Sequence, residues 1–217
     1  HSIYAKHPKE ELPRVTIGGE ACKQPYNASL FNISAMSFGA LSDRAQMALN
    51  RGAKKGNFYH NTGEGCISPH HLEGGVLCWQ IGTGYFGCRN EEGNFDAELF
   101  KKYANLENVK MIEIKLSQGA KPGHGGILPK EKVTDEIADI RLVGKGYDII
   151  SPPTHSAFST PLELMDFVKL LLKGSGGKPI GIKICIGNKT EFVAICKAMV
   201  ETKTYLDFIT VDGGEGG

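Results

Sequence analysis

Two lysines stand inside apolar runs that are typical of buried strands. Lys115 lies in MIEIKL and Lys183 lies in IGIKICI. A charged side chain in a buried parallel strand is costly unless it faces a group that pairs with it. Near the C-terminal end of a barrel strand, a lysine points into the mouth of the active site. Because two different predicted strands each carry such a lysine, we favour a role in the active site. The alternative is that the lysine side chains reach solvent from an edge strand.

Other candidate groups stand beside glycines. Lys121 lies in SQGAKPGHGG, where the flanking glycines let a ligand approach the backbone closely. The segment DGGEGG begins with Asp212-Gly213-Gly214, whose backbone N–H groups suit a phosphate or a flat ring. GTGYFG (82–87) matches a dinucleotide-binding pattern, but a polar turn follows it instead of a helix, so we favour a tight strand-end loop. GAKPGHGG lacks the Lys-Ser/Thr ending of a Walker loop.

A metal site is the weaker interpretation of the histidines and cysteines. Four of them lie close together in the sequence, at His60, Cys66, His70 and His71. Their spacing fits no usual zinc pattern, and no second pair completes four ligands, so we expect no metal ligand here. The six cysteines include no CxxC pair and are typical of the reduced thiols of a cytoplasmic protein.

Strand and helix patterns alternate along the chain and would position these groups. A brief extended segment is predicted over 14–18, and strands are predicted over 29–36, 57–61, 76–81, 109–116, 148–151, 179–186 and 208–211. Helices are predicted over 41–55, 95–105, 134–143, 161–173 and 190–202. In the first helix, Leu41, Ala45, Ala48 and Leu49 share one face; Ser42 and Thr190 are placed as helix caps. About seven strand–helix units indicate a parallel sheet covered on both faces.

An open doubly wound sheet and a (β/α)₈ TIM barrel both fit this alternation. Glycine and polar clusters follow the predicted strands at their C-terminal ends, which favours the barrel because a barrel builds its site from all of these loops. A complete barrel typically takes about 250 residues, and this chain has 217. We therefore expect an α/β barrel that is truncated before its last strand. It would comprise a lead-in segment over 1–28 and the barrel domain over 29–217, incomplete at its C-terminus.

Composition and charge exclude several classes of protein. The chain has 25 Lys+Arg against 24 Asp+Glu, without the basic excess of a nucleic-acid binder. It contains no apolar run of about 18 residues that would span a membrane, and from its polar opening we expect no signal peptide. We expect a cytoplasmic protein with no nucleic-acid partner and no membrane segment in this chain. Because no initiator methionine is present, we also expect a fragment or a processed product.

Several segments together resemble one family. They are ISAMSFGALS (33–42), NTGEG (61–65), IGTGYFGCR (81–89), MIEIKLSQGAKPGHGGILP (111–129), SPPTHSAFSTP (151–161) and ITVDGGEGG (209–217). These segments look like the FMN-binding synthase domain of glutamate synthase. The resemblance covers nearly the whole chain, and KLSQGAKPGHGG is too long and specific to match by chance. The opening, 1–29, looks more like the shorter, stand-alone members than the large multidomain enzyme.

The resemblance implies a (β/α)₈ barrel with FMN at its C-terminal mouth. In the family's reaction, ammonia adds to 2-oxoglutarate, and hydride from reduced FMN converts the 2-iminoglutarate to L-glutamate. The chain would then be an oxidoreductase acting on CH–NH2 donors in glutamate biosynthesis, a part of nitrogen metabolism. Its electron donor would be an NAD(P)H reductase or ferredoxin. The family's cluster-binding cysteines follow DGGEGG, so an iron–sulfur cluster would depend on residues beyond this chain.

The family's site positions transfer onto matching residues. The FMN-binding positions are Ala35, Met36 and Ser37 beside the ring, Gln80 at the ring edge, Lys183 by N1 and C2, and Asp212, Gly213 and Gly214 along the ribityl chain and phosphate. The substrate-binding positions are Gln118, Lys121 and Arg141, and the catalytic positions are Glu64, Lys115 and Gln118. Cys66 stands where the family normally has glycine, so we expect the loop geometry to differ there.

Two further functions stay open. The first is an FMN-binding electron-transfer or assembly module of the same fold without glutamate synthase activity. The presence of Glu64, Gln118, Lys121 and Arg141 favours the enzyme, because a flavin carrier needs none of them; the alternative for Arg141 is a place on the surface of its helix. The second is an FMN-barrel enzyme that oxidises a hydroxy acid with a histidine base. His124 and His155 lie in strand-end loops, but neither lies in a matching motif.

Overall fold

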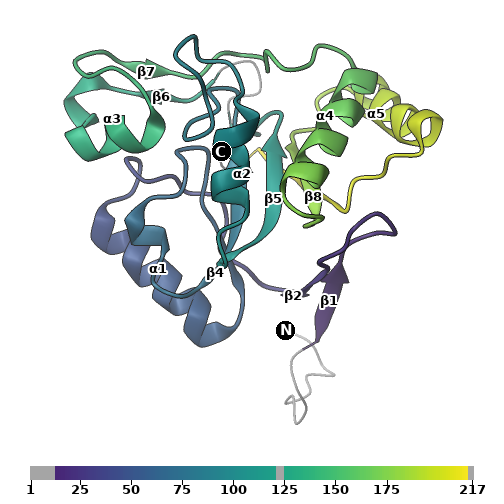
Figure 1. Cartoon of the computed structure of the whole chain (residues 1–217), viewed down its shortest axis with the longest axis horizontal. Coiled ribbons are helices and arrows are strands. Elements are labelled where there is room, and N and C mark those ends of the chain that lie inside the picture. The colour runs from purple at the N-terminus through teal and green to yellow at the C-terminus, as the bar shows by residue number, and fades with distance from the viewer. Residues whose placement is uncertain (1–12, 121–124, 215–217) are drawn as a thin grey trace.

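A five-stranded parallel sheet forms the centre of the computed structural model, which describes residues 13–120 and 125–214 (Figure 1). The strands are β3 (Tyr59–Asn61), β4 (Val76–Ile81), β5 (Val109–Lys115), β8 (Ile180–Ile184) and β9 (Phe208–Val211), paired in that order. The order follows the chain without a reversal, so the sheet lacks the switch point of a doubly wound fold. The fold is α/β with a curled parallel sheet, compatible with part of a (β/α)₈ barrel.

The two faces of the sheet differ in chemistry because successive side chains alternate between them. Trp79 of β4 lies on the apolar face and stacks on Phe100 with ring centroids 5.5 Å apart. On the other face, Gln80 stands in register with Glu113, and Lys115 stands in register with Lys183. The charged residues of β5 and β8 therefore share one polar face, while the apolar face packs under the helices.

The described part of the chain contains five α-helices, and their ends follow local capping chemistry. They are α1 (Asp43–Gly56), α2 (Ala97–Ala104), α3 (Asp135–Arg141), α4 (Pro161–Gly174) and α5 (Lys189–Thr202). The Ser42 side chain accepts a hydrogen bond from the Ala45 N–H, which confirms the predicted cap of α1. Asn188 caps α5, so the prediction that Thr190 is its cap was wrong by two residues. Short 3₁₀ turns cover Pro69–His71 (η1) and Lys130–Lys132 (η2).

Two predicted strands are not strands of the central sheet. Within 29–36, only Ile33 makes a parallel bridge, to His60, while Leu30 and Phe31 are exposed. The nearest strand, β2 (Tyr26–Ser29), instead forms an antiparallel hairpin with β1 (Arg14–Ile17). Within 148–151, β7 (Ile149–Ile150) pairs antiparallel with the unpredicted β6 (Ile127–Leu128). Among the described residues, the central sheet therefore has five strands, and not the seven or so that the sequence predicted. The prediction failed because a short apolar run carries no information about its pairing partner.

Hydrogen bonds decide which face of α1 is buried. Gln46, Asn50 and Ala53 face inward, instead of the predicted face. Gln46 Nε2 donates to the Met36 carbonyl oxygen at 2.8 Å, and Asn50 Oδ1 accepts from the Gly75 N–H at 2.9 Å. Buried polar groups need such partners, and loops distant in the sequence supply them here. The same contacts place the 35–37 segment against α1.

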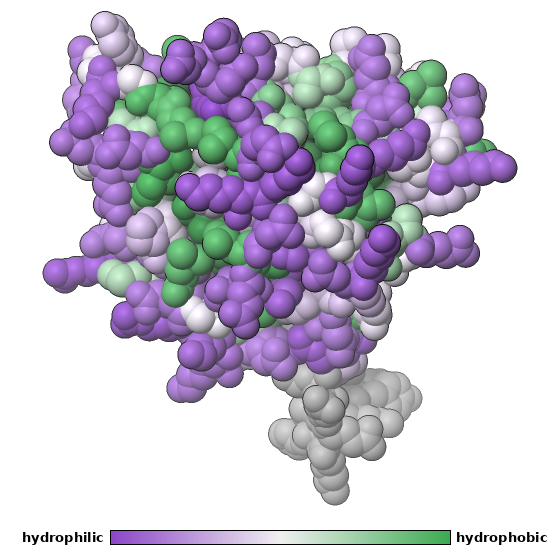
Figure 2. Space-filling model, viewed as in Figure 1, coloured by the Kyte–Doolittle hydropathy of each residue, from purple (hydrophilic) through white to green (hydrophobic). Residues whose placement is uncertain are grey.

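Apolar side chains gather on the upper and middle parts of one face of the molecule, where polar side chains interrupt them (Figure 2). In the described ranges, no helix is long and apolar enough to cross a membrane. All six cysteines are free thiols, as predicted.

Candidate functional site

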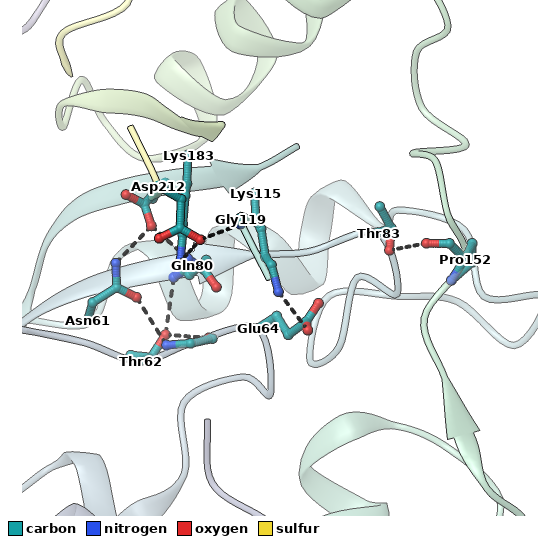
Figure 3. Close-up of polar contacts among 12 residues, drawn as sticks. Asn61, Thr62, Glu64, Gln80, Thr83, Lys115, Gly119, Pro152, Lys183 and Asp212 are labelled. Carbon is teal, nitrogen blue, oxygen red and sulfur yellow. Dashed lines mark hydrogen bonds and ion pairs between the residues drawn. The ribbon is translucent and has the colours of Figure 1, made fainter. Parts of the chain in front are cut away.

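The two lysines in apolar strands are neighbours at the C-terminal edge of the sheet. Lys115 of β5 stands in register with Lys183 of β8, and both strands are internal, so they are not lysines of an edge strand. Lys115 Nζ lies 2.9 Å from Glu64 Oε1, and Lys183 Nζ lies 3.5 Å from Asp212 Oδ2 (Figure 3). The two lysine side chains are only 12% and 9% exposed. Each ammonium group therefore has its own carboxylate partner.

Glycines make room for the Glu64 carboxylate in the loop that follows β3. A Cβ on Gly82, just after β4, would overlap Glu64 Oε2. A Cβ on Gly126 would lie 2.6 Å from Glu64 Oε1. Any larger side chain at either position would displace the carboxylate. Three strand-end loops therefore converge where Glu64 meets Lys115.

A narrow pocket lies beside this ion pair. Its lining includes Glu64, Lys115 and Gln118, the three residues predicted as catalytic, together with Thr83 and Pro152. Gln118 is 4% exposed. Thr83 Oγ1 donates to the Pro152 carbonyl oxygen at 2.6 Å and so joins two of the strand-end loops (Figure 3). The pocket volume of about 20 Å³ suits one molecule of the size of water.

The residues predicted to bind the cofactor gather along the same edge. Gly63 has a φ of +66°, and a Cβ there would lie 2.5 Å from the Ser37 backbone nitrogen, so only glycine lets the 35–37 segment pack on the loop after β3. The Gly119 N–H donates to Asp212 Oδ2 at 2.9 Å. A Cβ on Gly119 would overlap the Gly213 carbonyl oxygen, so these two backbones touch. Gly213 and Gly214 are themselves exposed.

Arg141 is buried, so the alternative of a surface position on its helix is wrong. It is 5% exposed, and its Nη2 donates to the Phe38 carbonyl oxygen at 2.9 Å. Its guanidinium carbon lies 5.1 Å from the centroid of the Phe86 ring. Burial lowers the pKa of Arg141, and the nearby Glu64 carboxylate opposes this shift. Arg141 thus approaches the Glu64 loop, although it is not part of the lining of the narrow pocket.

Of the two histidines considered as a catalytic base, the structure describes only His155. His124 lies outside the described residues, as does the substrate-binding candidate Lys121. His155 is buried, with Nε2 2.8 Å from the Lys115 carbonyl oxygen and Nδ1 2.9 Å from the Tyr85 hydroxyl. A carbonyl oxygen only accepts, so Nε2 carries the proton and Nδ1 accepts from Tyr85. Burial lowers the pKa of His155. It therefore orients the end of β5 instead of serving as a free base.

Sequence reasoning missed Glu113, which is 2% exposed on the polar face of the sheet. Its carboxylate accepts hydrogen bonds from Asn61, Gln80 and Thr210. Burial raises the pKa of Cys78 well above its usual value, and the Glu113 carboxylate raises it further. The signal was present in the sequence, because Glu113 interrupts the same apolar run as Lys115.

Two members of the histidine–cysteine cluster pack against each other. The rings of His60, on β3, and His71, in η1, have centroids 5.3 Å apart. Burial lowers the pKa of His60 to about 4 and that of His71 to about 3. Across residues 13–120 and 125–214, no group of three or more His, Cys, Asp or Glu side chains is placed to hold a metal ion.

Comparisons with known proteins agree on one family. The family model described as "Conserved region in glutamate synthase" matches residues 6–217. The chain is 42% identical, over 99% of its length, to the "Glutamate synthase large subunit-like protein YerD" of Bacillus subtilis (strain 168). It is 36% identical, over 85% of its length, to the "Archaeal glutamate synthase [NADPH]" of Archaeoglobus fulgidus.

The chain corresponds to only part of these relatives. It spans 40% of the Bacillus subtilis protein and 33% of the Archaeoglobus fulgidus protein. A third relative, the "Glutamate synthase large subunit-like protein" of Rhizobium meliloti (strain 1021), is 29% identical over 94% of this chain and 42% of its own length.

Proposed function

This chain belongs to the glutamate synthase family, and from that premise we propose that it is the FMN-binding domain of a glutamate synthase-type oxidoreductase. Residues 1–28 form a lead-in and residues 29–217 belong to a (β/α)₈ barrel. The enzyme makes L-glutamate from 2-oxoglutarate and ammonia through 2-iminoglutarate. The observation that carries this proposal is the side-by-side placement of two ion pairs, Lys115–Glu64 and Lys183–Asp212, at the C-terminal edge of the sheet.

The residues at this edge suit an FMN cofactor. Lys183 offers a nearly buried cation to the electron-rich edge of a flavin ring, and Gln80 lies on the same polar face of the sheet, on β4. The exposed backbone of Gly213 and Gly214 suits a phosphate, because it has no side chain to block approach to its N–H groups. Ala35, Met36 and Ser37 would border the ring. When bound, FMN would supply the hydride that reduces the imine.

The substrate would be held by charges at both of its ends. Arg141 can grip a carboxylate with its planar fork, and Lys121 can act as a point charge on a second carboxylate. Gln118 can donate to the keto or imine region from the wall of the narrow pocket.

Proton transfer would fall to the Lys115–Glu64 pair. Lys115 can polarise the keto carbon for attack, and Glu64, 2.9 Å away, can orient ammonia and take up its proton. The neighbouring pocket is of the size of one water or ammonia molecule. The His155 hydrogen bond to the Lys115 carbonyl oxygen would hold this lysine in place.

The enzyme is favoured over a flavin carrier for a chemical reason. A carrier needs no paired Lys115–Glu64 beside a narrow pocket and no buried Arg141. Electrons would come from an NAD(P)H reductase or ferredoxin, and an iron–sulfur cluster would require residues outside this chain. With six free thiols, we place the reaction in the cytoplasm.

The test is cofactor release followed by an assay. The full protein that carries this domain should purify yellow, and acid should release FMN and not FAD. With FMN and a chemical reductant, it should form L-glutamate from 2-oxoglutarate and ammonium. The same preparation with Glu64→Gln should keep FMN and lose most of this activity. A protein that stays colourless in excess FMN, or that releases FAD, rejects the proposal.

A further inference from the structure

One buried carboxylate links most of the strands of the sheet. Glu113 lies two residues before Lys115 on β5, on the same face. Its Oε1 accepts hydrogen bonds from Asn61 Nδ2 at 2.8 Å and from Gln80 Nε2 at 2.7 Å. Its Oε2 accepts from Thr210 Oγ1 at 2.6 Å. The three donors are neutral and come from β3, β4 and β9.

Strand β8 lies between β5 and β9 and does not block the hydrogen bond between Glu113 and Thr210. The residue of β8 in register with Glu113 is Gly181, so β8 contributes no side chain at that level. Glu113 can therefore reach Thr210 across an intervening strand. Such a long-range connection stabilises the curl of the sheet at the level just below the two lysines.

The network also decides which end of each amide faces Glu113. Asn61 Oδ1 accepts from the Gly63 N–H at 3.0 Å, so the NH2 end of Asn61 must face the carboxylate. A carboxylate only accepts hydrogen bonds, so Gln80 must also present its NH2 group to Glu113. The carbonyl oxygen of Gln80, an acceptor, is the end that remains for a ligand.

We propose that Glu113 is a positioning residue that locks Gln80 as a hydrogen-bond acceptor at the cofactor site and holds the Asn61–Gly63 turn that leads to Glu64. The cofactor half of this inference rests on the proposed function. An acceptor at that place selects a ligand with an N–H donor on the edge of a planar ring. The oxidised flavin ring carries one such N–H group.

Glu113 has an electrostatic consequence as well. Its charge lies two residues, roughly 7 Å along the strand, from Lys115, on the face shared with Lys183. It therefore offsets the positive charge that would favour a reduced, anionic flavin. Removing this charge without changing the shape of the side chain should raise the flavin reduction potential.

Glu113→Gln is the decisive variant, because it keeps the size of the side chain while removing the charge. The first measurement uses the ligand-free protein and the ¹⁵N resonances of its side-chain amides. In Glu113→Gln, the NH2 signals of Gln80 and Asn61 should shift and exchange faster, while that of buried Asn50, which is bonded elsewhere, should not. If the Gln80 and Asn61 signals are unchanged in Glu113→Gln, Glu113 does not orient these side chains and the inference is wrong.

The second measurement uses the FMN-loaded protein. Glu113→Gln should weaken FMN binding about threefold to tenfold, the usual effect of one lost hydrogen bond, and should raise the flavin potential. The control, Glu98→Gln, removes an exposed carboxylate on α2 and should change neither. If Glu113→Gln leaves affinity and potential unchanged while the wild type binds FMN, the inference is wrong and the proposed function stands. If the wild type binds no FMN, the proposed function fails, and so does the part of this inference that concerns the cofactor. The amide signals then still show whether Glu113 fixes the orientation of Gln80 and Asn61.

Discussion

The Cys66 sulfur lies where a side chain on Gly87 would have to be. A Cβ on Gly87 would overlap Cys66 Sγ, and Cys66 itself has a φ of +71°, a backbone conformation that favours glycine. The loop after β3 thus makes a left-handed turn at Cys66. Gly87, with a φ of +82°, makes the space that the larger residue needs.

Gly87→Ala should therefore lower the free energy of unfolding by about 2–4 kcal/mol, from overlap with Cys66 and from the positive φ. In the Cys66→Gly background the overlap disappears, so the same change should cost only about 1–2 kcal/mol. Urea unfolding of the four proteins measures this cycle. Gly146→Ala is the matched control, because Gly146 has a similar φ of +84° and a Cβ there meets nothing within 4 Å. Equal costs in both backgrounds would reject the coupling.

The same burial should make Cys66 unreactive. Burial raises the pKa of its thiol to about 12. At pH 8 only a minute fraction would be thiolate, the reactive form. Labelling of the native protein with a thiol reagent should therefore modify the half-buried Cys22, Cys185 and Cys196 well before Cys66. Peptide mapping after timed labelling checks the order, and early modification of Cys66 would show that the loop opens.

Lys183→Met should lower the reduction potential of bound FMN. The change removes a cation from the edge of the ring and leaves Asp212 without its ion-pair partner, so both effects disfavour a negatively charged reduced flavin. A spectroelectrochemical titration measures the potential. Lys169→Met, which removes an exposed cation on α4, should leave it unchanged. A potential that rises in Lys183→Met would place this lysine away from the flavin.

Arg141→Ala should raise the KM for 2-oxoglutarate by roughly tenfold to a hundredfold, since a charged contact to the substrate contributes about 1.5–3 kcal/mol. FMN content should stay intact. Because Arg141 is buried against Phe38 and Phe86, the variant should also melt earlier. Steady-state kinetics and thermal unfolding separate the two effects. Arg51→Ala, on the exposed side of α1, is the control. A lowered melting temperature with an unchanged KM would leave Arg141 with a structural role alone.

Stability should fall in mild acid because His60 and His71 are buried in their neutral forms. Burial lowers their pKa values to about 4 and about 3, while both would be near 6.5 in the unfolded chain. Below pH 6.5 the unfolded state therefore binds more protons than the folded state. Each histidine then costs about 1.4 kcal/mol per pH unit, until the pH reaches its folded pKa.

Urea unfolding at pH 7.5, 6.0 and 5.0 measures this dependence. The full contribution should be present above pH 6.5 and decline steadily below it. His60→Gln should flatten the decline, because one of the two groups no longer titrates. A slope that is the same in wild type and variant would show that His60 does not contribute.

The sequence by itself determined the elements with strong local signals. The periodic segment 161–173 is α4, and the apolar runs of 76–81 and 208–211 are β4 and β9 with the predicted bounds. It also singled out one candidate residue in each of β5 and β8, because a lysine in an apolar run is costly wherever the strand lies. Lys115 and Lys183 were identified on that basis alone, and Glu113 carried the same signal.

Only the tertiary structure decided which groups meet. Lys115 and Glu64 are 51 residues apart, and Gly119 and Asp212 are 93 apart. Local periodicity contains no information about such partners, which depend on strand register and on where glycines let loops approach. For the same reason, the sequence placed Arg141 on its helix but could not show that it contacts the Phe38 carbonyl oxygen. The sequence also predicted the wrong buried face for α1. Hydrogen-bond partners far along the chain outweighed the local apolar pattern at Gln46 and Asn50.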